Sequence, residues 1–282
     1  MATGAQQLAV PSEGVALAGE QSGAGTPIVL LHGLSATRRY VVMGSNALQR
    51  SGHRVLAYDA RGHGASTPAP DRAYGYEHLG ADLLAVLDAT GLERAVLVGA
   101  SMGAHTALRL ALAHPERVAA LGLITPSFDP DAPSSAAGLA RWDALAHGLR
   151  TGGVEGFVAA YDLDAVPAAW RSTVGTVLRQ RLSLHEHPEA VADALEAVPR
   201  SRPFDAWGEL EQLRVPTLVI GSRDEADPGH PLATAERYAA AVAGARLLVE
   251  EAGPPARSPL AWQGGQLSRA LAELVGHVEA RT

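Results

Sequence analysis

Two residue types are missing from this chain of 282 residues: it contains no cysteine, and all 23 of its basic residues are arginine. The absence of cysteine excludes a disulfide framework, a thiolate nucleophile and a zinc–sulfur site. The absence of lysine excludes a Schiff base with a carbonyl or pyridoxal cofactor, and it also excludes a Walker A lysine. The chemistry must therefore depend on hydroxyl, carboxylate, imidazole and guanidinium groups.

Clustered positive charge and long apolar runs are scarce as well. The formal net charge is −7, whereas nucleic-acid binding needs a clustered basic face. No apolar run approaches the roughly 20 residues of a membrane-spanning helix. Residues 1–25 contain neither the basic start nor the apolar core of a secretory signal. We therefore expect a cytoplasmic protein, monomeric or homodimeric, that acts on a small molecule and has no nucleic-acid or membrane partner.

Short apolar runs alternate with longer helical patterns, which is typical of a mostly parallel sheet flanked by helices. The spacing of Leu79, Leu83 and Leu87 predicts one such helix, which ends before Gly91. Buried strands are predicted at six places: Ile28–Leu31, Arg54–Tyr58, Ala95–Val98, Leu121–Ile124, Thr217–Ile220 and Arg246–Val249. The pattern therefore indicates the α/β class.

The alternation stops between residues 127 and 213, where the pattern is helical and interrupted by prolines. A helical insertion between two strands of one sheet is most simply a cap over the carboxyl edge, where open α/β sheets bind their ligands. We therefore predict a core domain of residues 1–126 and 214–282 and a helical cap of residues 127–213. The first dozen residues are expected to be loosely ordered.

The motif that carries chemistry is Gly99-Ala100-Ser101-Met102-Gly103, which follows a predicted strand and opens a predicted helix. This is the G-x-S-x-G nucleophile elbow in its strand–turn–helix context. A side chain at Gly99 or Gly103 would collide with the crossing strand or helix, and Ser101 would be held in a strained conformation that exposes its hydroxyl. The N–H of Met102, at a helix N-terminus, would point to where an oxyanion forms. Ser101 is therefore the predicted nucleophile.

With the elbow, other segments resemble the α/β-hydrolase-fold superfamily over about Glu13 to Val275. His32-Gly33 resembles the H-G oxyanion loop, residues 59–66 resemble the D-x-R-G-x-G-x-S loop, and His114–Val118 resembles the H-P-x-x-V helix exit. The resemblance implies an α/β-hydrolase fold, with a mostly parallel central sheet flanked by helices and the helical cap inserted after the sixth strand. A serine at the elbow favours acyl chemistry.

The resemblance also implies roles for individual residues. Leu34 would supply the second oxyanion N–H beside that of Met102, and His32 would orient the oxyanion loop. Pro216–Asp224 resembles the strand and loop that present the triad acid, which would be Asp224. These residues and Ser101 define the expected site.

The sequence departs from the family pattern at the general base. The family order is serine, acid, histidine, with the histidine in the loop after the last strand, yet here that loop reads Glu251–Pro259 and contains no histidine. Either Pro254 or Arg257 occupies the position, and neither proline nor a guanidinium group can serve as a base. Because loss of the triad histidine costs about 10⁶ in turnover, an efficient esterase needs another base.

Two histidines follow Asp224, and His230 is the better replacement because it lies six residues on, in a loop expected to border the site. The alternative for His230 is a solvent-facing or capping role at the start of a helix over residues 232–242. His277 is expected on the surface of the C-terminal helix. Among the earlier histidines, His63 fits a loop-bracing role and His105 belongs to the helix after the elbow. His185 and His187 are too few for a metal site, so no metal is expected.

Three functions remain open. The first is a cofactor-free acyl hydrolase that cleaves an ester, lactone or thioester with Ser101, a displaced base and an orienting Asp224. The second is a non-hydrolytic lyase, in which the oxyanion hole stabilises an enolate and Arg257 binds a carboxylate or enolate oxygen. The third is a binding protein that keeps the pocket without turnover.

Overall fold

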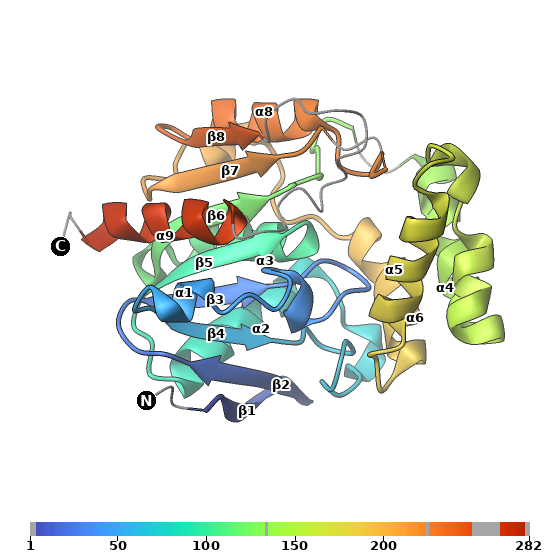
Figure 1. Ribbon diagram of the computed structural model, residues 1–282, viewed down its shortest axis with the longest axis horizontal. Helices are drawn as coiled ribbons and strands as arrows, with labels where there is room; N and C mark the ends of the chain where they lie inside the picture. The colour runs from blue at the N-terminus through green and yellow to red at the C-terminus, as the bar shows by residue number, and fades with distance from the viewer. Residues whose placement is uncertain (1–3, 133–134, 224–225, 250–265, 280–282) are drawn as a thin grey trace.

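A central sheet of eight strands organises the molecule, a computed structural model that describes residues 4–132, 135–223, 226–249 and 266–279 (Figure 1). The strand order is β1-β2-β4-β3-β5-β6-β7-β8, with antiparallel pairing at β1–β2 and β2–β4 and parallel pairing across the rest. The strands are β1 Gln6–Ser12, β2 Val15–Ser22, β3 Pro27–Leu31, β4 Arg54–Tyr58, β5 Ala95–Ala100, β6 Val118–Ile124, β7 Thr217–Gly221 and β8 Arg246–Val249. All six predicted strands are therefore present.

The N-terminal hairpin corrects one expectation. Residues 6–12 are not loosely ordered, because β1 pairs with β2 along its whole length, from Gln6 opposite Gln21 to Ser12 opposite Val15. The two residues between the strands, Glu13 and Gly14, both have positive φ, at 40° and 81°. Such a turn matches the twist of an antiparallel hairpin. The prediction missed the hairpin because its apolar alternation is weak: the outward Ala9, Ala16 and Ala18 are apolar like the inward Val10 and Leu17.

Helices cover both faces of the sheet and give it two apolar layers. Leu87, Leu108 and Tyr238 pack from α2, α3 and α8 on one face, and Leu48 and Leu271 pack from α1 and α9 on the other (Figure 1). The helices are α1 Ala47–Arg50, α2 Tyr76–Ala89, α3 Met102–Ala113, α4 Ala136–Ala160, α5 Arg171–Leu182, α6 Pro188–Ala197, α7 Trp207–Leu210, α8 Leu232–Ala241 and α9 Gln266–Glu279.

The segment between β6 and β7 is helical, and no strand occurs in its described part. Its helices α4, α5 and α6 lie beyond the carboxyl ends of the parallel strands (Figure 1). They share a core of their own, in which Leu149, Phe157 and Leu195 are buried and against which Leu34 of the expected oxyanion loop packs. Helices placed there can cover a site at the sheet edge, although the division into a core domain and a cap domain stays a prediction.

Across the described part of the chain, no helix combines the length and the apolar character needed to span a bilayer.

Candidate active site

The elbow between β5 and α3 has the strained geometry that its sequence predicts. Ser101 has φ 49° and ψ −113°, and residues other than glycine rarely adopt a positive φ. A Cβ on Gly99 would lie 2.1 Å from the carbonyl carbon of Gly103, and a Cβ on Gly103 would lie 2.2 Å from the Leu31 oxygen. Because only glycine fits at both positions, the strand and helix approach closely enough to force Ser101 outward.

The imidazole of His230 lies within hydrogen-bond distance of the Ser101 hydroxyl. Ser101 Oγ lies 2.8 Å from His230 Nε2, and His230 Nδ1 lies 2.8 and 2.9 Å from the two carboxylate oxygens of Asp227. With the proton on Nδ1, the ring donates to Asp227 and accepts the proton of the serine hydroxyl. This is the hydrogen-bonding order of a serine, histidine and acid triad.

The histidine and its acid come from one short loop between β7 and α8. The His230 N–H donates to the Asp227 carbonyl at 3.2 Å, which turns the backbone so that both side chains face the same way. Their side chains remain 23% and 38% exposed. Burial opposes ionisation of Asp227, but the hydrogen bond from His230 and the positive charges of His230 and Arg181 outweigh it, so the pKa of the carboxyl falls below its ordinary value. The acid therefore stays ionised beside the imidazole.

Two residues expected in the site, Asp224 and Arg257, lie outside the described residues. The carboxylate that contacts His230 is that of Asp227, which the sequence reasoning did not assign as an acid. A signal was available, because the spacing Asp227-Pro228-Gly229-His230 places the two side chains three residues apart across a Pro-Gly turn.

The expected oxyanion loop packs closely against the elbow. A Cβ on Gly33 would lie 3.4 Å from the Ala100 oxygen and 3.5 Å from the Ser101 Cβ. The N–H of Ala36 donates to the Gly33 oxygen at 3.0 Å, which closes a turn around Leu34. Met102, the first residue of α3, belongs to a buried apolar cluster against which Leu34 packs. The loop therefore brings the Leu34 peptide close to the nucleophile.

His32 holds this loop in place rather than taking part in proton transfer. Its Nε2 accepts from the Ala60 N–H at 2.9 Å, and its Nδ1–H donates to the Gly33 carbonyl at 2.8 Å. Burial lowers the pKa of His32 to about 3, so the ring is neutral and can accept the Ala60 bond. The structure thus gives His32 the orienting contacts that were expected.

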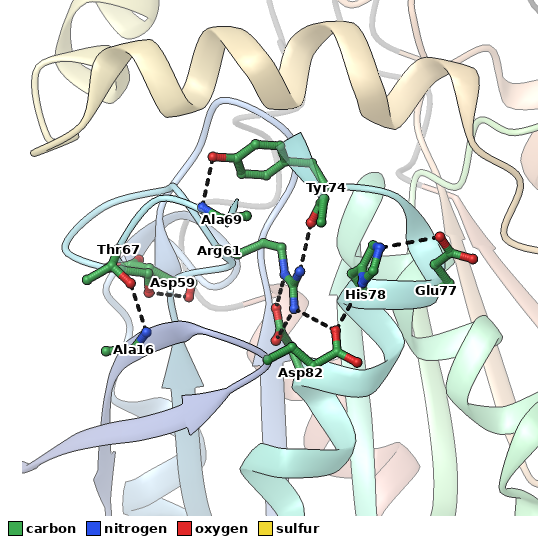
Figure 2. A network of polar contacts seen from close by, with 12 residues as sticks. Ala16, Asp59, Arg61, Thr67, Ala69, Tyr74, Glu77, His78 and Asp82 are labelled. Carbon is green, nitrogen blue, oxygen red and sulfur yellow. Dashed lines mark hydrogen bonds and ion pairs between the residues drawn. The ribbon is translucent and has the colours of Figure 1, made fainter. Parts of the chain in front are cut away.

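The D-x-R-G loop that presents Ala60 is itself fixed by a buried ion pair. Arg61, which is fully buried, donates to both carboxylate oxygens of Asp82 at 2.7 Å and to the Ala73 carbonyl at 2.7 Å (Figure 2). Around it, Tyr74 and Thr67 bond the backbone N–H groups of Ala69 and Ala16. Charge-assisted bidentate bonds of this kind fix a guanidinium in one orientation. The loop that Arg61 fixes includes Ala60, which donates to His32, and His32 in turn donates to the Gly33 carbonyl of the expected oxyanion loop.

The remaining histidines near the elbow have structural partners. His105 Nε2 accepts from the N–H groups of Ser127 and Phe128 at 3.1 Å, and its Nδ1–H donates to the Tyr76 hydroxyl at 3.0 Å. Burial, together with the charge of His230, lowers the pKa of His105 to about 3. His63 donates to the Arg61 carbonyl at 3.0 Å. These contacts agree with the structural roles expected for both.

The inserted segment contributes two polar side chains whose contacts with the expected oxyanion loop the sequence did not predict. Arg181, at the end of α5, donates to the Leu34 carbonyl at 3.1 Å and to the Ser35 hydroxyl at 3.3 Å. His185 accepts from the Gly64 N–H at 2.8 Å and donates to the Ser35 carbonyl at 3.2 Å. No group of three or more histidine and acidic residues suited to a metal occurs among the described residues. His185 therefore ties the inserted segment to the oxyanion loop.

The eight-stranded sheet with helices on both faces is an α/β-hydrolase fold. The chain belongs to the alpha/beta hydrolase fold family, whose model matches residues 26–255, and it is a hydrolase of that fold.

Three known proteins illustrate the likeness. The Variovorax paradoxus protein named "Putative carbamate hydrolase RutD" is 33% identical over 216 residues, which cover 72% of this chain and 75% of that protein. A thermophilic esterase from Thermogutta terrifontis has a TM-score of 0.77 and 26% identity, with 97% and 99% of the two chains covered. The enol-lactonase from Burkholderia xenovorans has a TM-score of 0.72 and 26% identity, with 98% and 100% covered.

Proposed function

We propose that the protein hydrolyses a small ester, lactone or thioester, with Ser101 as nucleophile, His230 as general base and Asp227 as the acid that orients it. The observation that carries the proposal is the continuous line of short contacts from Asp227 through His230 to Ser101. In such a line the imidazole is held in the tautomer that accepts a proton from the hydroxyl.

The reaction then runs in two halves. Ser101 Oγ attacks the carbonyl carbon while His230 Nε2 takes the hydroxyl proton, and the N–H groups of Leu34 and Met102 receive the negative charge that develops on oxygen. His230 returns the proton to the leaving alcohol or thiol, which leaves an acyl group on Ser101. Water next attacks that acyl group, with His230 again as base, and releases the acid.

The lyase hypothesis arose from the missing imidazole. Because His230 stands 2.8 Å from the Ser101 hydroxyl, the reason for preferring elimination or decarboxylation over acyl transfer is removed. A purely binding role would leave this proton-transfer geometry without a use. We therefore propose hydrolysis rather than a lyase reaction or a purely binding role.

Covalent labelling with a fluorophosphonate tests the proposal. The wild-type protein is expected to be labelled at Ser101, Ser101→Ala is not, and Ser172→Ala, an exposed serine of α5, is labelled like the wild type. Turnover is measured on a panel of p-nitrophenyl acetate, a γ-lactone, an acyl thioester and an aryl carbamate, the last because of the name of the Variovorax relative. The proposal fails if Ser101 is not labelled and no member of the panel is cleaved in a Ser101-dependent way.

A further inference from the structure

The guanidinium of Arg181 is the one cation that the described structure places both on the inserted helices and against the oxyanion loop. The side chain is half-buried, and its Nη2 donates to the Leu34 carbonyl and the Ser35 hydroxyl. The ring of Tyr40 lies below, 5.9 Å from the guanidinium carbon. The charge therefore sits one peptide away from the expected oxyanion N–H.

Among the described residues, Arg181 has no counter-ion. No carboxylate oxygen of those residues lies within 4.0 Å of it, its Nε is buried with no acceptor, and its Nη1 forms no hydrogen bond with them. Arg179, two residues earlier on the same helix, donates to both oxygens of Glu155 at 2.7 Å. Burial lowers the pKa of Arg181, because a cation withdrawn from water is costly unless an anion or other acceptors compensate it.

The carboxylate whose charge raises the pKa of Arg181 is that of Asp227, which contacts His230. The charge of Asp227 and that of Arg181 influence each other's ionisation, and both act on the Tyr161 hydroxyl. Asp227 already accepts the His230 ring N–H through both oxygens. Arg181 consequently lies against the Leu34 peptide, within electrostatic reach of Asp227, and its Nη1 donors have no acceptor among the described residues.

We propose that Arg181 binds a carboxylate of the substrate, so that the acyl compound carries a free carboxylate a few bonds from the reacting carbonyl, as in the half-ester of a short dicarboxylic acid. The inference rests on the proposed function, because that function places the reacting carbonyl at Ser101. The Nη1 group carries two N–H donors that no described residue accepts, so it can form a charge-assisted hydrogen bond with a carboxylate oxygen. Binding of the carboxylate supplies the missing counter-ion and orients the ester toward the oxyanion N–H groups.

The test compares two substrates of nearly the same shape, monomethyl succinate and methyl butyrate, of which only the first carries a carboxylate. The wild type is expected to show the higher kcat/KM on monomethyl succinate. Arg181→Gln should lower that value about 10- to 100-fold, since a hydrogen bond to a charged group contributes that much in binding. It should lower the value for methyl butyrate by a clearly smaller factor, because only the contacts with Leu34 and Ser35 are lost there. Arg179→Gln is the matched control on the same helix and should leave the preference intact.

A binding measurement separates this inference from the proposed function. Succinate has no ester to cleave, so titration calorimetry with succinate reports the anion site without catalysis. Binding to the wild type and to Arg179→Gln, with loss in Arg181→Gln, supports the site even if fluorophosphonate labelling and ester turnover fail. Equal succinate binding by wild type and Arg181→Gln overturns it.

An equal loss on both esters in Arg181→Gln would also overturn it, because that result describes a tether for the oxyanion loop and not a carboxylate site. Should Arg181→Gln fail to fold, Arg181→Lys serves instead. That variant keeps the cation but loses the donor position of Nη1. It must weaken the preference for monomethyl succinate, and an unchanged preference overturns the assignment of Nη1 as the donor to the carboxylate.

Discussion

Ser101 and His230, the proposed nucleophile and base, are held by contrasting means. Ser101 lies between a buried strand and a buried helix, where missing side chains at Gly99 and Gly103 let backbone atoms approach so closely that no other residue fits. His230 lies on a loop, partly exposed, and is positioned by its hydrogen bonds to Asp227 and Ser101. Steric exclusion fixes the first, and polar contacts fix the second. The two regions should consequently respond in opposite ways to substitution, one in stability and the other in rate.

Removing the base gives the largest expected effect and falls on rate alone. His230→Ala should lower kcat for a cleaved ester by about 10⁶, and Ser101→Ala with His230→Ala together should lower it no further, because the residues act as a unit. The free energy of unfolding should change little, since the side chain is partly exposed. Steady-state kinetics and chemical denaturation of the same samples measure both. A variant that keeps substantial turnover would show that another group accepts the proton.

Substituting the acid gives the next largest effect and separates two candidate residues. Asp227→Asn should lower kcat by about 10⁴, because the amide favours the wrong imidazole tautomer. Asp224, which the sequence prediction named, should give the smaller loss as Asp224→Asn. The two kcat values measured side by side decide the assignment. A larger loss at Asp224 would return the acid role to the residue that the family pattern implies.

Filling the elbow should damage the fold. Gly99→Ala places a methyl group 2.1 Å from the Gly103 carbonyl carbon, and overpacking between backbones of this kind should cost about 3 kcal/mol or more in unfolding free energy. Gly276→Ala is the matched control, because nothing lies within 4 Å of its added Cβ. Alanine has a higher helix propensity than glycine, so this variant should raise the unfolding free energy by up to about 1 kcal/mol. Urea denaturation measures both. Equal stability of the two variants would contradict steric control of the nucleophile.

Lowering the pH should reduce the free energy of unfolding through buried histidines near the elbow. Burial lowers the pKa values of His32 and His105 to about 3 in the folded protein, from an ordinary 6.5. The unfolded chain therefore takes up these protons first, so the stabilisation is complete above pH 6.5 and is lost as the pH falls from 6.5 towards 3. At about pH 5 each of these two histidines should lower the free energy of unfolding by about 2 kcal/mol relative to neutral pH.

The unfolding free energy between pH 7 and 4, followed by urea titration, measures this loss. His105→Gln should reduce the slope, whereas His78→Gln, which replaces a partly exposed histidine on α2, should keep it. A slope that is unchanged by His105→Gln would place the acid sensitivity elsewhere in the chain.

The same contrast explains what the sequence could and could not predict. The elbow and the six parallel strands follow from local patterns, because glycine spacing and apolar runs express steric needs directly. The hairpin of β1 and β2 was missed since its alternation is weak. His230 was predicted as the base and lies on Ser101, whereas Asp227 was not found, because its role depends on how one loop folds. Arg181 was missed because a contact across 147 residues leaves no local trace.

The three-residue separation of Asp227 and His230 has a consequence for how such a site can arise. The pair is complete before α8 begins and needs only one turn of backbone to form, so its assembly carries almost no loop-closure entropy. Asp227 and His230 are encoded together within four consecutive codons. A single short exchange of sequence after β7 would therefore move both side chains together.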